Sequence, residues 1–96
     1  MKVIELFPLV GSFAENKDKA NRIRIDEILP AIQNGEEVVL DFIGIGSVTQ
    51  SFIHALISDL LRRYGGEVLD ILLFKNCNAE VQKIISIVVE YMQESE

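Results

Sequence analysis

The chain has 96 residues, of which 49% are hydrophobic and one is cysteine, and its formal net charge is −6. This length suits one domain, and because the single Cys77 cannot close an intrachain disulfide, the domain must be stabilised by packing, as in a reducing cytoplasm. The negative charge argues against a nucleic-acid partner, which needs clustered Lys and Arg, and no apolar stretch approaches the roughly 18 residues of a membrane span. We therefore expect a single cytoplasmic domain over residues 1–96, with no nucleic-acid or membrane partner.

The N-terminal residues predict two short strands. Val3–Phe7 is largely apolar and is followed by Pro8, which cannot donate a hydrogen bond to a strand ladder and is tolerated mainly at sheet edges. Residues 9–13 predict a second short strand beside the first. A helix follows these strands.

The first predicted helix begins near Lys17, because Asn16 is a favourable N-cap and apolar residues recur after it with helical spacing. Pro30 is unfavourable inside a helix unless a kink or a new turn begins there. The pair Asn34–Gly35 suits the left-handed backbone at a helix C-terminus, so the helix is expected to end there. The basic residues between Lys17 and Arg24 are interpreted as a solvated helix face with i,i+4 ion pairs.

The middle of the chain predicts a buried strand, a turn and a second helix. Val38–Phe42 is short, apolar and rich in β-branched residues, which is typical of a strand buried on both faces. Asp41 is expected at its carboxyl end, bonded to N–H groups of the turn. After two glycines, Thr49 and Ser51 offer side-chain oxygens to the free N–H groups of a helix that runs from about Thr49 to Tyr64.

The C-terminal part predicts one more strand and helix. Val68–Phe74 has the composition of a buried strand, and Asn78 is a good N-cap for a helix that extends to about Met92. Ile87 and Tyr91 widen the apolar face of this helix beyond the stripe that a surface helix needs. We expect them to cover a sheet edge, and contact with a partner is the alternative.

Strands that alternate with helices through short connections predict an α/β domain with parallel central strands joined by right-handed crossovers. Four segments of the chain, in order and with matching spacing, resemble the motifs of STAS domains, in particular a STAS-like branch of unknown function. These segments are residues 11–14 (GSFA), 35–42 (GEEVVLDF), 49–52 (TQSF) and 76–81 (NCNAEV). The resemblance covers most of residues 3–92. It implies a mixed sheet of about four strands backed by about three helices.

The resemblance also implies a function in switching protein partnerships rather than in catalysis. In anti-sigma-factor antagonists of this fold, a histidine-kinase-like ATPase phosphorylates a hydroxyl at the start of the second helix, and this modification abolishes partner binding. Gln50 occupies the position of the phosphorylated serine here, so Thr49 and Ser51 are the remaining candidate phospho-acceptors. Phe52 replaces a glycine of the motif.

We therefore expect a regulatory interaction module whose partner is a protein, either a histidine-kinase-like ATPase or a transcription regulator. The expected partner-binding surface comprises Gly46, Ser47, Gln50, Phe52, His54 and Ser58. Three alternatives remain open: Thr49 and Ser51 act only as helix caps, the free N–H groups from Gly46 to Ser51 bind a nucleotide or phosphate, or Ile87 and Tyr91 form a homodimer.

No catalytic, cofactor or metal site is expected. Ser51, His54 and Ser58 share a helix face, but no carboxylate is placed to orient the imidazole. One His and one Cys lie 23 residues apart, which is not the spacing of a metal site. The glycines at 44 and 46 lack the third glycine of a dinucleotide-binding motif.

Overall fold

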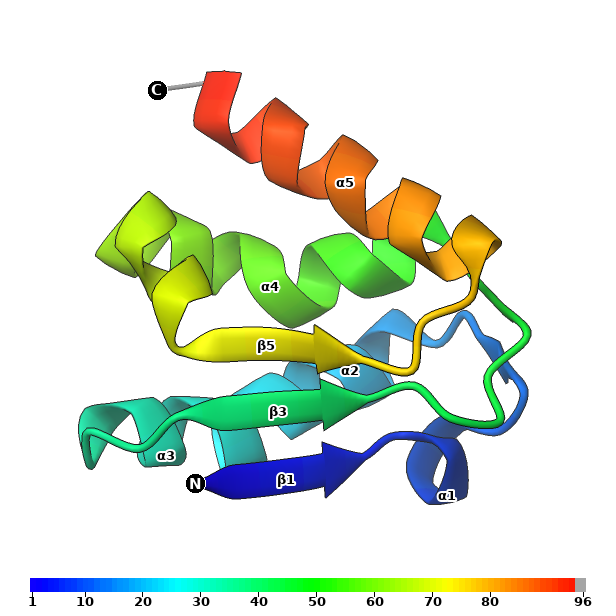
Figure 1. Cartoon of the computed structure of the whole chain (residues 1–96), viewed down its shortest axis with the longest axis horizontal. Helices are drawn as coiled ribbons and strands as arrows, with labels where there is room; N and C mark the ends of the chain where they lie inside the picture. The colour runs from blue at the N-terminus through cyan, green and yellow to red at the C-terminus, as the bar shows by residue number, and fades with distance from the viewer. Residues whose placement is uncertain (95–96) are drawn as a thin grey trace.

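Three short parallel strands form the central sheet in the computed structural model of the protein, which describes residues 1–94 (Figure 1). The strands β1 (Lys2–Glu5), β3 (Val38–Asp41) and β5 (Leu72–Lys75) lie in the order β1-β3-β5. Helical connections return the chain to the same end of the sheet, which makes both strand pairs parallel. The expectation of a mixed sheet is therefore wrong for the described residues, while the expectation of parallel central strands is confirmed.

A second, two-stranded parallel sheet joins β2 (Phe13–Ala14) to β4 (Ser47–Val48), which brings the described strands to five. The strand expected over residues 9–13 is wrong at its start, because Leu9 and Val10 belong to α1 (Phe7–Val10), and only Phe13 of these residues lies in a strand. Pro8 lies in the first turn of this helix, where its missing N–H is not needed. The proline that we interpreted as a strand terminator therefore starts a helix.

The first long helical segment combines α2 (Lys17–Ile23), the π-helical turn η1 (Arg24–Ile28) and α3 (Leu29–Gln33). The Asn16 side chain caps it by accepting hydrogen bonds from two backbone N–H groups, as expected. In η1 the backbone bonding shifts, so that the N–H of Leu29 donates to the carbonyl of Arg24. The wider π turn accommodates Pro30 within a continuous helix, because the proline has no N–H to donate and its ring crowds the preceding turn.

Two further helices complete the described chain: α4 (Gln50–Tyr64) and α5 (Ala79–Glu94). Both begin at the expected caps. Between them, the first part of the expected strand Val68–Phe74 is wrong, because residues 66–70 form the 3-10 helix η2 (Gly66–Asp70) and the strand begins only at Leu72. Counting α2, η1 and α3 as one segment and leaving the 3-10 helix η2 aside, four helical segments are described where about three were expected. No helix within residues 1–94 is long and apolar enough to span a membrane.

The hydrophobic core lies between the helices and one face of the central sheet. Ile4 and Leu40, neighbours on β1 and β3, belong to this core, as do the fully buried rings of Phe42 and Phe52. In Figure 1 the strands lie in front of α2 and α3. Helix α4 packs against both α2 and α5, so it is buried over a broad arc.

The expectation that Ile87 and Tyr91 cover a sheet edge is wrong. The two side chains retain 38% and 61% of their accessible surface. Only the inner face of α5, which includes Val81, Val88 and Met92, is buried. Ile87 and Tyr91 are therefore accessible to a partner.

Candidate functional site

The start of α4 is held in place by the small sheet that precedes it. The backbone N–H of Gly46 donates to the carbonyl of Ser12 over 2.8 Å, and the N–H of Thr49 donates to the carbonyl of Ala14 over 3.0 Å. Together with the pairing of β2 and β4, these bonds fix the direction in which the chain enters the helix. The turn is therefore an ordered surface.

Thr49 is the N-cap of α4. Its backbone is extended, and its Oγ1 atom accepts a hydrogen bond from the N–H of Phe52 over 3.1 Å. The first N–H groups of a helix have no partner within the helix, so this bond satisfies one of them. The expected capping role of Thr49 is confirmed, whereas Ser51 lies within the first turn of the helix and is exposed.

Exposed polar side chains surround the first turn of α4. Gln50, Ser51 and His54 are all exposed, and together with Lys17 at the start of α2 they line a shallow hollow of about 370 Å³. Gly46 is exposed and Ser47 is half-buried beside them. We call these residues together the α4 entry surface: Gly46, Ser47, Gln50, Ser51 and His54 with Lys17.

Two residues expected on this surface do not belong to it. Phe52 is fully buried in the core, and Ser58 is buried on the inner side of α4. The reason is tertiary: α4 packs against both α2 and α5, and this buries more of its circumference than one apolar stripe suggests. Phe52 and Ser58 are therefore withdrawn from the partner-binding surface.

Asn78 connects the α4 entry surface to α5, and sequence reasoning recognised only one of its two contacts. Its Oδ1 atom accepts from the N–H of Val81 over 2.8 Å, which caps α5 as expected. Its Nδ2 atom donates to the carbonyl of Gly46 over 2.8 Å. One amide side chain thus ties the starts of two helices together. An asparagine at an N-cap gives no sequence signal for its second partner.

Asp41 organises the carboxyl ends of β3 and β5. Its Oδ1 atom accepts from the side-chain amide of Asn76 over 2.9 Å and from the backbone N–H of Ile43 over 3.0 Å, which confirms the expected bond to the turn. The amide of Asn76 is the main cause that holds the pKa of Asp41 below its usual range, followed by the Ile43 N–H, and Lys75 adds to the effect. A carboxylate stabilised in this way is a structural tie rather than a proton donor near neutral pH.

Cys77 follows at the same end of the sheet and is half-buried. Burial raises the pKa of its thiol, and the charge of Asp41 raises it further. A thiol whose pKa is raised is a poor nucleophile, because the thiolate is the reactive form. Within residues 1–94, no three His, Cys, Asp or Glu side chains lie close enough together to hold a metal ion.

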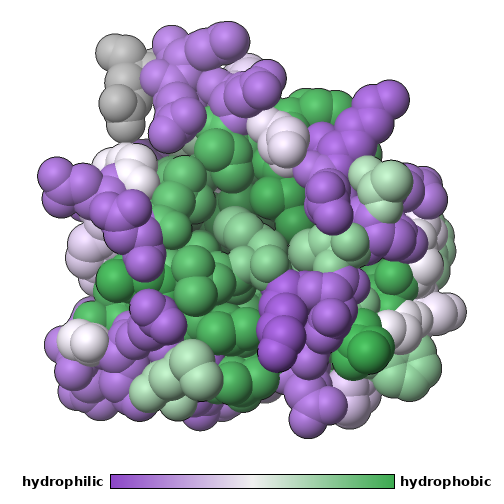
Figure 2. Space-filling model, viewed as in Figure 1, coloured by the Kyte–Doolittle hydropathy of each residue, from purple (hydrophilic) through white to green (hydrophobic). Residues whose placement is uncertain are grey.

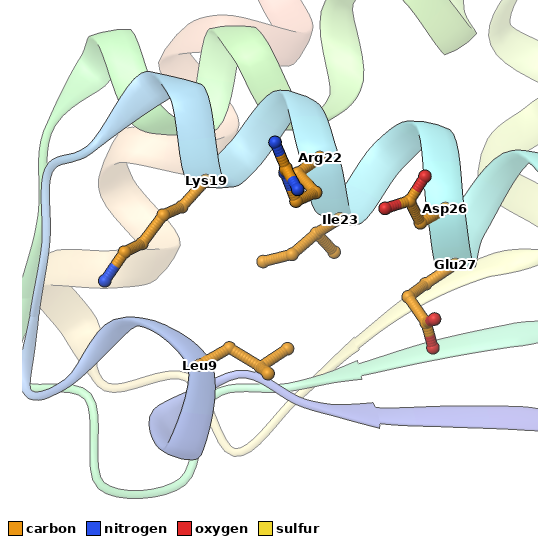
Figure 3. A pocket seen from close by; sticks show the side chains of 6 residues that line it. All are labelled: Leu9, Lys19, Arg22, Ile23, Asp26 and Glu27. Atoms are coloured by element: carbon orange, nitrogen blue, oxygen red, sulfur yellow. The ribbon is translucent and has the colours of Figure 1, made fainter.

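A separate pocket of about 450 Å³ lies between α1 and α2 (Figure 3). Leu9 and Ile23 face one another across it, with Lys19 and Arg22 on one side and Asp26 and Glu27 further along the helix. Glu27 forms an ion pair with Lys2 over 3.2 Å.

The interpretation of the basic residues between Lys17 and Arg24 as a solvated face needs one correction. Arg24 is half-buried, and its guanidinium donates to the side chain of Asn21 and to the carbonyl of Ala55 in α4. It therefore joins α2 to α4. Within the described chain, none of these basic residues forms one of the expected i,i+4 ion pairs.

The α4 entry surface presents exposed donors and acceptors on a turn that backbone and side-chain hydrogen bonds hold in place. The hydroxyl of Ser51 is among the exposed groups, whereas the hydroxyl oxygen of Thr49 accepts the capping bond.

A model of the STAS-like domain of unknown function (DUF4325) matches residues 19–82 of the chain. Neither the curated proteins nor the solved structures gave a match. The matched residues run from α2 to the first turn of α5, and so include the Asp41 turn and, apart from Lys17, the α4 entry surface.

Proposed function

The chain belongs to the STAS-like domain family, and we propose that it is a non-enzymatic regulatory module that binds another protein through the α4 entry surface. The observation that carries this proposal is the accessibility of Gln50, Ser51 and His54 on a turn that Thr49 and Asn78 hold rigid. A preformed, exposed polar surface can be recognised without a costly rearrangement. The resemblance of the sequence motifs to anti-sigma-factor antagonists supports the same class of function.

We propose further that the switch residue is Ser51 rather than Thr49. The Thr49 hydroxyl oxygen is used by the helix cap, whereas the Ser51 hydroxyl is exposed. A phosphate on Ser51 would lie in the first turn of α4, where the helix dipole favours negative charge, and beside Lys17. The modification would therefore leave the helix stable, and it would add negative charge to a surface that otherwise carries the positive charge of Lys17.

The proposed modification is transfer of the γ-phosphoryl group of ATP by a partner kinase of the histidine-kinase-like ATPase type. The Ser51 oxygen forms the new bond to phosphorus, the bond to ADP breaks, and the hydroxyl proton passes to a base on the kinase. A transcription regulator is the alternative partner, and cytoplasmic location is part of the proposal.

The test begins with co-purification of the protein from its native cytosol and measurement of its intact mass for an added phosphoryl group. The partner that is found is then titrated by calorimetry against wild type, Ser51→Asp and Gln33→Glu. The last variant adds the same charge at an exposed site at the end of α3. We expect Ser51→Asp alone to weaken binding by roughly tenfold or more, as for a charge placed against a docked surface. Equal affinities for all three proteins would contradict the proposal.

The same titration format separates the anion-binding alternative. Nucleotides and inorganic phosphate are titrated in place of the protein partner. Saturable micromolar binding that is lost in Ser51→Asp would favour a small-ligand site at the start of α4.

A homodimer through α5 is a second candidate, and the exposure of Ile87 and Tyr91 favours it. Light scattering measures the mass in solution. Under this hypothesis the wild type is a dimer that Tyr91→Lys dissociates. A wild-type monomer removes the hypothesis.

A further inference from the structure

One face of the central sheet is not covered by any described helix. The pairing of the strands places Val3, Val39 and Leu73 side by side, and successive residues of a strand point to opposite faces. Their neighbours Ile4 and Leu40 belong to the core, so Val3, Val39 and Leu73 point away from it. Val3 is 51% exposed and Leu73 is 38% exposed, while Val39 between them is 7% exposed and stands outside the core cluster.

This uncovered face is apolar over a wide area. Figure 2 shows hydrophobic residues gathered over the centre of the view in which the strands lie in front. The apolar surface continues into a groove of about 370 Å³ between β5 and α5, whose walls include Leu69, Phe74, Ile85 and Val89. Parallel sheets are almost always covered on both faces, so an open one indicates a missing partner.

The dimensions of the face fit an α-helix. Three strands about 4.8 Å apart present a row roughly 10 Å wide, which is about the diameter of a helix with its side chains. Strands of four residues are about 13 Å long, which matches roughly two to three helical turns. The groove beside α5 lengthens the contact further.

The charges around the face select a basic occupant. Two residues further along the three strands, and so on the same face, lie Glu5, Asp41 and a single basic residue, Lys75. Glu90 lines the groove. Within residues 1–94, none of these acidic residues forms an ion pair. A second copy of this chain, with its own net charge of −6, would bring acidic groups against acidic groups.

We infer that the face formed by Val3, Val39 and Leu73, with the adjoining groove, binds an amphipathic helix of a partner protein that carries an apolar stripe flanked by Lys or Arg. In this mode the apolar stripe packs on the sheet, and the basic side chains reach the acidic residues Glu5, Asp41 and Glu90 around the face. This surface is distinct from the α4 entry surface, so the inference does not depend on Ser51.

The test uses two synthetic helical peptides of about 18 residues, or five turns, with the same leucine stripe and one tryptophan. One has lysine at its polar positions and the other has glutamate. Because the chain contains no tryptophan, peptide fluorescence anisotropy reports binding directly. We expect saturable binding of the lysine peptide and at least roughly tenfold weaker binding of the glutamate peptide. Methyl NMR shifts should map to Val3, Val39 and Leu73.

Matched variants locate the site. Leu73→Lys and Val3→Lys alter exposed side chains of the face, and each should weaken binding of the lysine peptide by roughly tenfold or more. Ile25→Lys makes the same change at an exposed position of η1, in the helical layer on the other side of the sheet, and should leave affinity unchanged. Circular dichroism confirms that each variant is folded.

Three outcomes would overturn the inference. The first is equal binding of the two peptides, which would remove the role of charge. The second is a set of NMR shifts confined to the pocket between α1 and α2, or a loss of peptide affinity in Ile25→Lys as large as that in Leu73→Lys and Val3→Lys. The third is a wild-type dimer that Leu73→Lys dissociates, because a second copy would then be the occupant. A dimer that only Tyr91→Lys dissociates concerns α5 and leaves the sheet face free for the peptide.

Discussion

Replacement of Thr49 by alanine should destabilise the domain, whereas replacement of Ser51 by alanine should not. Thr49→Ala removes the Oγ1 atom that accepts from the N–H of Phe52. Loss of an N-cap typically costs about 1 kcal/mol, within a range of about 0.5–2. The Phe52 residue is fully buried, so water cannot easily replace the lost bond, and we expect about 1.5 kcal/mol.

Urea unfolding monitored by far-ultraviolet circular dichroism measures this loss as a change in the free energy of unfolding at constant m-value. For a domain of this size, a loss of about 1.5 kcal/mol lowers Tm by about 6–12 °C. Thr49→Ser is the matched control, because it keeps the accepting oxygen, and it should lie within about 0.5 kcal/mol of wild type. Ser51→Ala should do the same, as expected for an exposed position.

A loss below about 0.5 kcal/mol in Thr49→Ala, or an equal loss in Ser51→Ala, would refute this reasoning. The first result would mean that another donor-acceptor pair holds the helix start. The second would mean that Ser51 also stabilises the native helix, and its hydroxyl would then be a poor switch.

Three further predictions concern the core, the Asp41 turn and one glycine. Phe52→Ala should cost about 3–5 kcal/mol in urea unfolding, because it empties a fully buried site; a loss near zero would return Phe52 to the surface. Asn76→Gly tolerates the left-handed backbone at this position but removes the amide, so the pKa of Asp41 measured by carboxyl NMR should rise. A carboxylate whose pKa is lower in the native than in the unfolded state stabilises the fold at pH values above the unfolded pKa, and this stabilisation is lost as the pH falls through the native pKa. The difference in the free energy of unfolding between wild type and this variant should therefore shrink in acid. Gly35→Ala, at φ +76°, should cost about 1–2 kcal/mol, while Gly46→Ala, with its nearest neighbour at 3.8 Å, should cost less.

The helix starts could be predicted from the sequence because capping is local. Asn16, Thr49 and Asn78 each lie within three residues of the N–H groups that they cap. The order of strands and helices, and therefore the α/β class, follows from the same short-range patterns. The bond of Asp41 to the turn after β3 was also predictable, since it spans two residues.

The errors arise where a local pattern has two structural solutions. An apolar run such as Val68–Leu72 satisfies a strand or a 3-10 turn equally well, because Val68 is buried in either case. Pro8 is compatible with a strand edge and with the first turn of a helix. The alternation of strands and helices correctly predicted parallel central strands, whereas the mixed sheet was an implication of the family resemblance that the described strands contradict.

The composition of the candidate site was predictable only in part. Helical periodicity places Ser51, His54 and Ser58 on one face, but the packing of α2 and α5 around α4 buries Ser58 and leaves the other two exposed. The second contact of Asn78, with the carbonyl of Gly46, spans 32 residues and has no counterpart in local sequence. Only the tertiary structure defines these parts of the site.

A residue of a binding or switch surface can be altered without loss of the fold only if other residues stabilise the fold. In this structure the stabilising residues and the exposed residues are different ones. At the start of α4, Thr49 and Asn78 hold the backbone while Ser51 projects from it. On the sheet, alternation assigns Ile4 to the core and Val3 to the open face of the same strand. A charge placed on Ser51 or Val3 therefore acts on a partner rather than on the core, which is why binding and stability can be measured independently in these variants.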